Sequence, residues 1–146
     1  KDSPLAAATT IAEVRAALDG LTVGVQRSTI HQNFLEEEIP GAQLSLYDNQ
    51  DDLNLDLVAG RVDAGLADSS GWGPFLAADD GSAFAPFGPG LTGQEFPVFG
   101  EGPGIAFRQD EDELRAKFDA AIDSMQADGS LSALATQWFG YDISTN

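Results

Sequence analysis

Cysteine is absent from this chain of 146 residues, and histidine occurs only once, at His31. Without thiolates the chain can form no disulfide, no iron–sulfur cluster and no thiolate zinc site. A single imidazole also excludes a multi-histidine metal site, so we predict neither a metal ion nor a cofactor. A serine-type catalytic triad would have to use His31 as its base, and no nucleophile-elbow sequence is present.

Basic residues are also scarce, with seven Lys and Arg against 24 Asp and Glu and a formal net charge of −17. Nucleic acids and anionic lipid surfaces bind basic proteins, so we expect neither as a partner. An acidic surface favours solubility and can attract cations, although a salty or extracytoplasmic habitat would explain it equally well. No apolar run reaches membrane-spanning length, and the residues after Lys1 do not form a leader. If the protein is exported, we expect its leader to have been removed or to lie outside the given chain.

Hydrophobic residues make up 42% of the chain and charged residues 21%, which is typical of a globular protein with one sizeable core. Up to Asp68 the apolar pattern alternates between helical and strand periods. We predict helices over residues 11–18, 29–39 and 53–59, and strands over 21–26, 43–47 and 61–68. This order is typical of βαβ units and predicts an α/β fold with a largely parallel sheet.

The chain changes in character after Asp68, where glycine and proline become frequent. We predict a turn over 69–74, a short helix over 75–78, a short strand over 84–87 and a connector over 88–104. One further strand is predicted over 104–108. Two amphipathic helices, over 112–127 and 130–139, complete the predicted elements.

The stretch from Leu21 to His31 reads as a buried strand that leads into a helix. Ser28 or Thr29 is placed to cap that helix through its hydroxyl group. A helix start exposes unpaired N–H groups and the positive end of the helix dipole, so it can hold a carboxylate or a phosphate. An ordinary capped turn that binds nothing has the same sequence, and local pattern alone leaves both interpretations open.

Five segments, in the same order, resemble motifs of the bacterial amino-acid-binding proteins of ABC importers. They are Thr22-Val23-Gly24-Val25-Gln26 with Ser28-Thr29, Leu57-Val58-Ala59-Gly60-Arg61-Val62-Asp63-Ala64, Gly104-Ile105-Ala106-Phe107-Arg108, Asp128-Gly129 and Trp138-Phe139-Gly140. Within that family the surroundings of Phe75 and of Phe87 look closest to the lysine/arginine/ornithine-, histidine- and opine-binding types. The resemblance implies a periplasmic-binding-protein type II fold, in which two α/β lobes close on a ligand about a hinge.

The resemblance also implies a domain organisation. Residues 1–103 would form the second lobe, residues 104–107 the returning hinge strand, and residues 108–146 a helical segment that normally packs on the first lobe. The first lobe would be missing or supplied by a second chain. An unpaired hinge edge and an uncovered apolar stripe on the last two helices would then favour self-association.

Site residues follow from the resemblance one position at a time. In the family, the positions of Thr29 and Ile30 bind the ligand α-carboxylate through hydroxyl and backbone N–H groups, and Ile30 lacks the hydroxyl that relatives often have. The acidic position of Asp68 pairs with the ligand α-ammonium group. Ser28 stands where glycine is usual, which should stiffen the turn. The further ligand-binding candidates are Gln26, Ser28 and His31.

We therefore expect a periplasmic binding module that has no catalytic residues. It would deliver an amino acid or an opine to the permease subunits of an ABC transporter. Two alternatives remain at this point. One is a dehydratase of the cyclohexadienyl or prephenate type on the same scaffold, with His31 as a general acid. The other is a ligand-sensing domain of a receptor or kinase.

Overall fold

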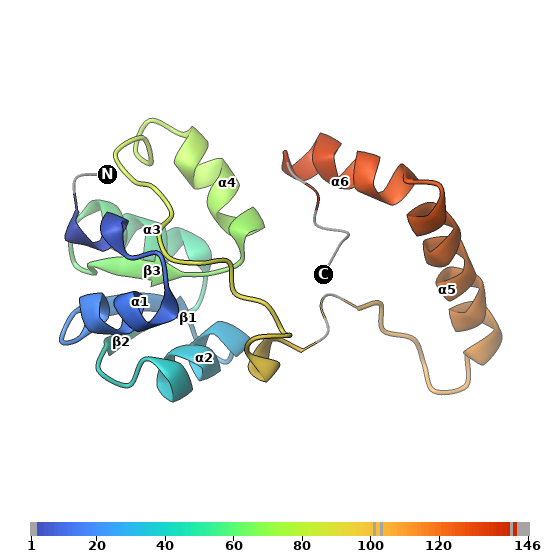
Figure 1. The fold of residues 1–146 in the computed structure, drawn as a ribbon, viewed down its shortest axis with the longest axis horizontal. Helices are drawn as coiled ribbons and strands as arrows, with labels where there is room; N and C mark the ends of the chain where they lie inside the picture. The colour runs from blue at the N-terminus through green and yellow to red at the C-terminus, as the bar shows by residue number, and fades with distance from the viewer. Residues whose placement is uncertain (1–2, 101, 103, 141, 143–146) are drawn as a thin grey trace. The chain divides into compact units, whose positions relative to one another are not determined.

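The structure is a computed structural model that describes residues 3–100, 102, 104–140 and 142. It consists of two compact units, Lys1–Glu101 (unit 1) and Gly102–Asn146 (unit 2), which are treated separately below. Unit 1 contains a parallel sheet with helices, and unit 2 contains two helices (Figure 1). The predicted α/β class is confirmed.

The sheet of unit 1 has three parallel strands in the order β2-β1-β3. They are β1 (Thr22–Gln26), β2 (Gln43–Tyr47) and β3 (Ala64–Leu66). Val25 of the central strand is in register with Leu46 on one side and Leu66 on the other. All three strands therefore end at the same edge of the sheet, which we call the carboxyl edge.

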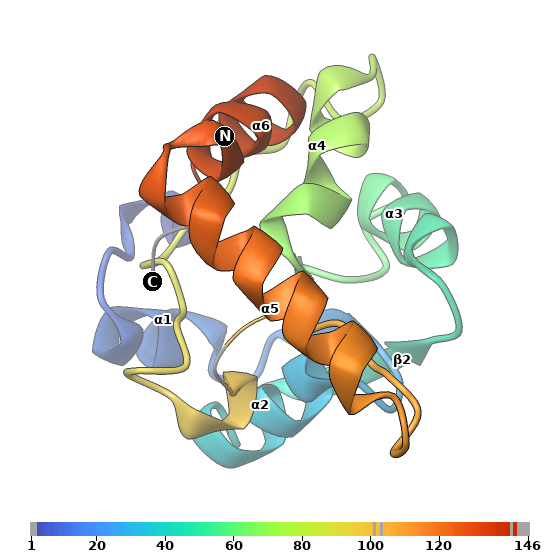
Figure 2. The ribbon, with the colours of Figure 1, turned by 90° about the vertical axis from the view of Figure 1, so that its right-hand side faces the viewer.

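The two faces of the sheet are covered by different helices. Val23 and Val25 are buried on one face, in a core formed with α1 (Ile11–Leu18) and α2 (Ile30–Glu38). Side chains alternate along a strand, so the intervening Gly24 faces the other side. There a Cβ on Gly24 would lie 3.0 Å from Cγ of Leu53, a fully buried residue of α3 (Gln50–Val58). Figure 2 shows α1 and α3 on opposite sides of unit 1.

Side-chain caps fix the starts of the first three α-helices. Thr10, Thr29 and Asn49 each accept a hydrogen bond from the backbone N–H three residues on, as N-caps do. Thr10 and Glu13 form the capping box that their spacing indicates. The backbone amides of Thr9 and Thr10 donate to the Glu13 carboxylate and hold its pKa below the ordinary value. The starts of α1 and α2 lie within one residue of those predicted, and α3 begins three residues earlier than predicted.

A polar cluster joins β2 to α3 and to the segment after it. The Tyr47 hydroxyl donates to Oδ2 of Asp56 over 2.7 Å, and Arg61 donates to Oδ1 of the same carboxylate. These hydrogen bonds, from Arg61 first and Tyr47 second, lower the pKa of Asp56. Partial burial in turn raises the pKa of Tyr47. The cluster anchors α3 against the sheet, on the face that Leu53 fills.

Two predictions for the middle of the chain are wrong. The structure has a single helix, α4 (Ser69–Ala77), where we predicted a turn followed by a helix over 75–78. Trp72 packs so closely on Gly65 of β3 that a Cβ added to this glycine would lie only 2.8 Å from Cη2 of Trp72. This contact favours helix over the expected turn. Residues 84–87 form no strand, because Pro86 has no N–H group for a strand ladder.

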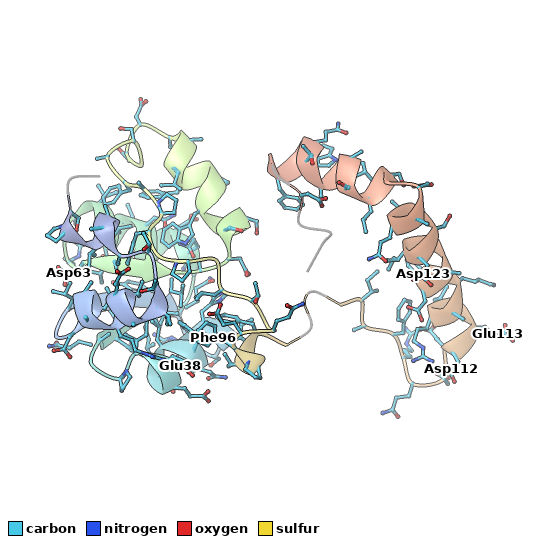
Figure 3. The ribbon with its side chains drawn as sticks, viewed as in Figure 1. Glu38, Asp63, Phe96, Asp112, Glu113 and Asp123 are labelled. Atoms are coloured by element: carbon cyan, nitrogen blue, oxygen red, sulfur yellow. The ribbon has the colours of Figure 1, made fainter. Side chains whose placement is uncertain are left out.

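The part of the connector that belongs to unit 1 packs on α2. It contains the short helix η2 (Pro97–Phe99), which contacts α2. Phe34 of α2, 1% exposed, has its ring centroid 5.1 Å from that of Phe96 and 5.0 Å from that of Phe99. Phe96, labelled in Figure 3, is itself buried in the core of unit 1. The connector therefore contributes to the core rather than acting only as a link.

Unit 2 contains α5 (Asp112–Ala127) and α6 (Ser130–Phe139), as predicted, joined at Gly129 with a φ of 78°. The acidic side chains of α5 labelled in Figure 3, Asp112, Glu113 and Asp123, are exposed. The large apolar side chains of unit 2 that are exposed are Ile105, Leu114, Phe118, Leu134, Trp138 and Phe139.

The strand predicted over 104–108 is not formed. A strand needs a partner for its N–H and C=O groups, and none of the described residues pairs with this segment. The assignment of residues 1–103, 104–107 and 108–146 to a lobe, a hinge and a lobe-covering segment remains a prediction.

Candidate functional site

The candidate site lies at the carboxyl edge, where β1 and β3 end side by side. After Gln26, β1 turns into α2, and after Leu66, β3 leads through Asp68 into α4. Neighbouring strands are only about 4.8 Å apart, so the two loops that follow them are close in space. Gln26 is the last residue of β1. The other predicted residues, Ser28, Thr29, Ile30, His31 and Asp68, belong to these two loops or to the helix starts that follow them.

Thr29 is the N-cap of α2 and its hydroxyl group has two partners. The hydroxyl donates to the carbonyl of Gln26 over 2.7 Å and accepts from the Gln32 amide over 3.3 Å. The amides of Ile30 and His31 belong to the first turn, whose N–H groups have no partner within the helix. An anion at this helix start would therefore meet backbone N–H groups, with the Thr29 hydroxyl proton directed to the turn itself.

Ser28 has a φ of 60°, the only positive φ among the described residues other than glycine. Its N–H group donates to Oε1 of Gln32 over 2.7 Å, so this amide is occupied within the turn. Gln32 was not among the predicted residues. The signal that points to it is the Thr29-x-x-Gln32 spacing of a capping box, in which the third helical side chain reaches back to the turn.

Ser28→Gly is expected to raise the free energy of unfolding by about 0.5 to 1 kcal/mol. Glycine removes the steric cost that a left-handed backbone imposes on an L-residue. Glycine also loses more chain entropy on folding than serine does, but this loss is the smaller of the two effects. Urea denaturation followed by circular dichroism would measure the change. Ser28→Ala keeps the Cβ and is expected to bring no gain, and a gain from alanine equal to that from glycine would contradict this account.

Asp68 is the N-cap residue of α4, but its side chain makes no capping hydrogen bond. The side chain is 78% exposed, and its Oδ1 lies 3.5 Å from Nε2 of His31. The His31 side chain is only 12% exposed, and its ring centroid is 5.9 Å from that of Phe99. His31 is thus held between α2 and η2 and does not project as an ordinary surface residue.

The remaining polar groups near this edge have other partners. Gln26 gives its main-chain carbonyl to Thr29, and its side chain is half-buried. Nε of Arg27 pairs with Oδ1 of Asp48 over 3.0 Å, which directs the guanidinium group toward β2.

No acidic or histidine cluster among the described residues could hold a metal ion. In the same part of the chain, no helix combines the length and apolarity needed to cross a bilayer.

A shallow hollow of about 420 Å³ lies elsewhere on unit 1, lined by Ser3, Pro4, Leu5, Ala17, Leu21 and Asp63. Leu21 and Asp63 precede β1 and β3, so this hollow is at the opposite edge of the sheet. It contains none of the predicted ligand residues. The groups that could bind an amino acid, a helix start and an exposed carboxylate, lie together at the carboxyl edge instead.

The chain is similar in sequence to bacterial amino-acid-binding proteins. The L-arginine-binding protein of Pseudomonas aeruginosa is 39% identical over 132 residues, which cover 88% of this chain and 50% of that protein. The histidine-binding periplasmic protein of Salmonella typhimurium is 33% identical over 135 residues, covering 88% and 50%. The chain thus spans about half the length of the curated relatives it matches.

Solved structures agree with the sequence matches. A Salmonella typhimurium periplasmic binding protein described as having high arginine specificity superposes with a TM-score of 0.67 at 27% identity, covering 91% of this chain and 56% of that one. A Silicibacter pomeroyi protein of the His/Glu/Gln/Arg/opine-binding family, solved with lysine, superposes with a TM-score of 0.62 at 31% identity, covering 84% and 54%.

The family match agrees with the motifs and spans nearly the whole chain, from residue 5 to residue 141. It is a match to solute-binding proteins rather than to an enzyme family, as predicted. The type II periplasmic-binding-protein fold inferred from the sequence is also confirmed by the structural neighbours. The chain belongs to family 3 of the bacterial extracellular solute-binding proteins.

Proposed function

We propose that this chain supplies the amino-acid-backbone contacts of an extracytoplasmic binding protein that delivers a basic amino acid, with L-arginine as the first candidate, to an ABC importer. The N-terminus of α2 would receive the α-carboxylate, and Asp68 would receive the α-ammonium group. The relatives named above include an arginine-binding protein, a histidine-binding protein and a protein solved with lysine, and they support this ligand class.

One observation carries the proposal, namely the contact between the two loops at the carboxyl edge. His31 belongs to the first turn of α2, and its Nε2 is 3.5 Å from the exposed carboxylate of Asp68. The carboxylate and ammonium groups of an amino acid sit on the same carbon, so their binding groups must also be neighbours. Here a helix start that attracts anions and a carboxylate that attracts cations meet this requirement.

The proposal also concerns the additional polypeptide that would complete the binding site. Since the chain spans half the length of its relatives, we assign the choice of ligand side chain to additional polypeptide, as a first lobe or a second chain. The exposed apolar side chains of unit 2 would pack against that polypeptide, or against a second copy where it is lacking. Closure about residues 104–107 would then present the loaded form to the permease.

Calorimetry on the complete gene product tests the proposal with three related ligands. L-Arginine is expected to bind, whereas agmatine, which lacks the carboxylate, and N-acetyl-L-arginine, which lacks the ammonium charge, are each expected to bind at least about tenfold more weakly. Agmatine that binds as tightly as arginine would refute carboxylate recognition at α2. N-acetyl-L-arginine that binds as tightly would refute ammonium recognition at Asp68.

A further inference from the structure

His31 has surroundings that single out Asp68 as its charged partner. On α2 itself, Glu36, Glu37 and Glu38 lie in the last turn, at the other end of the helix from His31, where Glu36 accepts from Gln32 and Glu38 pairs with Arg15. Arg27, just before the helix, is paired with Asp48. Among the described elements, α2 makes its main contacts with β1, which has no titratable residue, and with η2, which contributes the Phe99 ring. Of the described carboxylates, Asp68 is the one in ion-pair range of Nε2. The aromatic contact and the low exposure of His31 hold its ring in this orientation.

We propose that His31 is a positioning residue for Asp68 that makes capture of the ligand ammonium group depend on pH. This inference rests on the function proposed above. In its neutral form, the imidazole lies with Nε2 3.5 Å from Oδ1 of Asp68 and steadies the carboxylate without cancelling its charge. In its protonated form, the imidazolium neutralises the same carboxylate and competes with the ligand.

The sign of the effect follows from linkage. The imidazolium and the ligand ammonium group are both cations that are stabilised by Asp68, so binding of one disfavours the other. Ligand binding therefore releases a proton from His31, and acidification weakens the ligand. Histidine is the side chain that ordinarily changes charge between pH 5 and pH 8, which sets the range to examine.

Arginine affinity of the complete gene product at about pH 5.5 and about pH 8 tests the proposal. The natural protein is expected to bind about two- to fivefold more weakly at the lower pH, the size expected for an exposed ion pair. His31→Gln, which keeps a neutral donor, should bind equally at both pH values. His31→Lys, a permanent cation, should bind weakly at both. Asn33→Ala, on the exposed side of α2, should behave like the natural protein.

A pH dependence that persists unchanged in His31→Gln would overturn the proposal. A second measurement decides it without a ligand. NMR of the imidazole nitrogens reports on His31 once its signals are assigned by their loss in His31→Gln. Asp68→Asn is expected to reduce the imidazolium population at a fixed pH, whereas Asp48→Asn should not. If Asp68→Asn has no effect, His31 and Asp68 are not coupled. If the coupling is present but no arginine binds at either pH, the function proposed above fails, and with it the ligand competition.

Discussion

Asp68→Asn is expected to weaken L-arginine binding by about 1 to 3 kcal/mol, because asparagine keeps the shape of the side chain but loses the charge-assisted hydrogen bond to the ligand ammonium group. The folded state should be nearly unaffected. The Asp68 side chain is 78% exposed and caps no helix N–H, so little native structure depends on its charge. Calorimetry would measure the affinity, and thermal unfolding would show that the variant is intact.

Asp48→Asn is the matched control for this prediction. Asp48 also lies just beyond a strand at the carboxyl edge, but its carboxylate is paired with Arg27 on the β2 side. We expect this variant to bind arginine like the natural protein. If Asp68→Asn left the affinity unchanged, or if both variants weakened it equally, Asp68 would lose its assigned role and only a general effect of negative charge would remain.

Phe34→Ala is expected to lower the free energy of unfolding by about 3 to 5 kcal/mol, the usual cost of deleting a buried aromatic ring. The Phe34 side chain is 1% exposed and packs between the rings of Phe96 and Phe99. Its loss would leave a cavity between α2 and the returning connector. Small domains are stable by only about 5 to 15 kcal/mol, so the variant should unfold at a much lower urea concentration.

Two other variants show whether the cost arises from this packing. Phe34→Leu retains most of the apolar volume and should cost clearly less than Phe34→Ala. Trp138→Ala removes a larger side chain that is 75% exposed, and it should change the stability of the isolated chain by less than about 0.5 kcal/mol. A Phe34→Ala cost below about 1 kcal/mol would mean that the connector does not pack on α2 in solution.

The elements that local chemistry specifies were predictable from the sequence. Thr10 and Thr29 mark helix starts because a hydroxyl there satisfies an otherwise unpaired N–H group. Gly129 marks the corner between α5 and α6 because it adopts a left-handed backbone. The parallel sheet followed from the alternation of strand and helix patterns. The positions of the ligand candidates followed from family motifs, and their roles remain predictions.

The features that depend on contacts between distant residues were not predictable. Gly71 and Pro74 indicate a turn, but Trp72 packs against Gly65 of β3, and the segment is helical. The contact between His31 and Asp68 joins the start of α2 to the N-cap of α4, and no local pattern specifies it. The sequence could place both residues near the site, but it could not show that the imidazole is largely buried beside Phe99.

The strand order β2-β1-β3 also bears on the sequence of events during folding. The central strand is first along the chain, and β3 lies about twice as far from it in sequence as β2 does. Closing the longer loop costs about 0.6 kcal/mol more in chain entropy, so the β1–β2 pair should form before β3 docks. Until β3 docks, Asp68 cannot reach α2. The binding site is then the last part of the sheet to assemble, and ligand would stabilise only chains that have completed it.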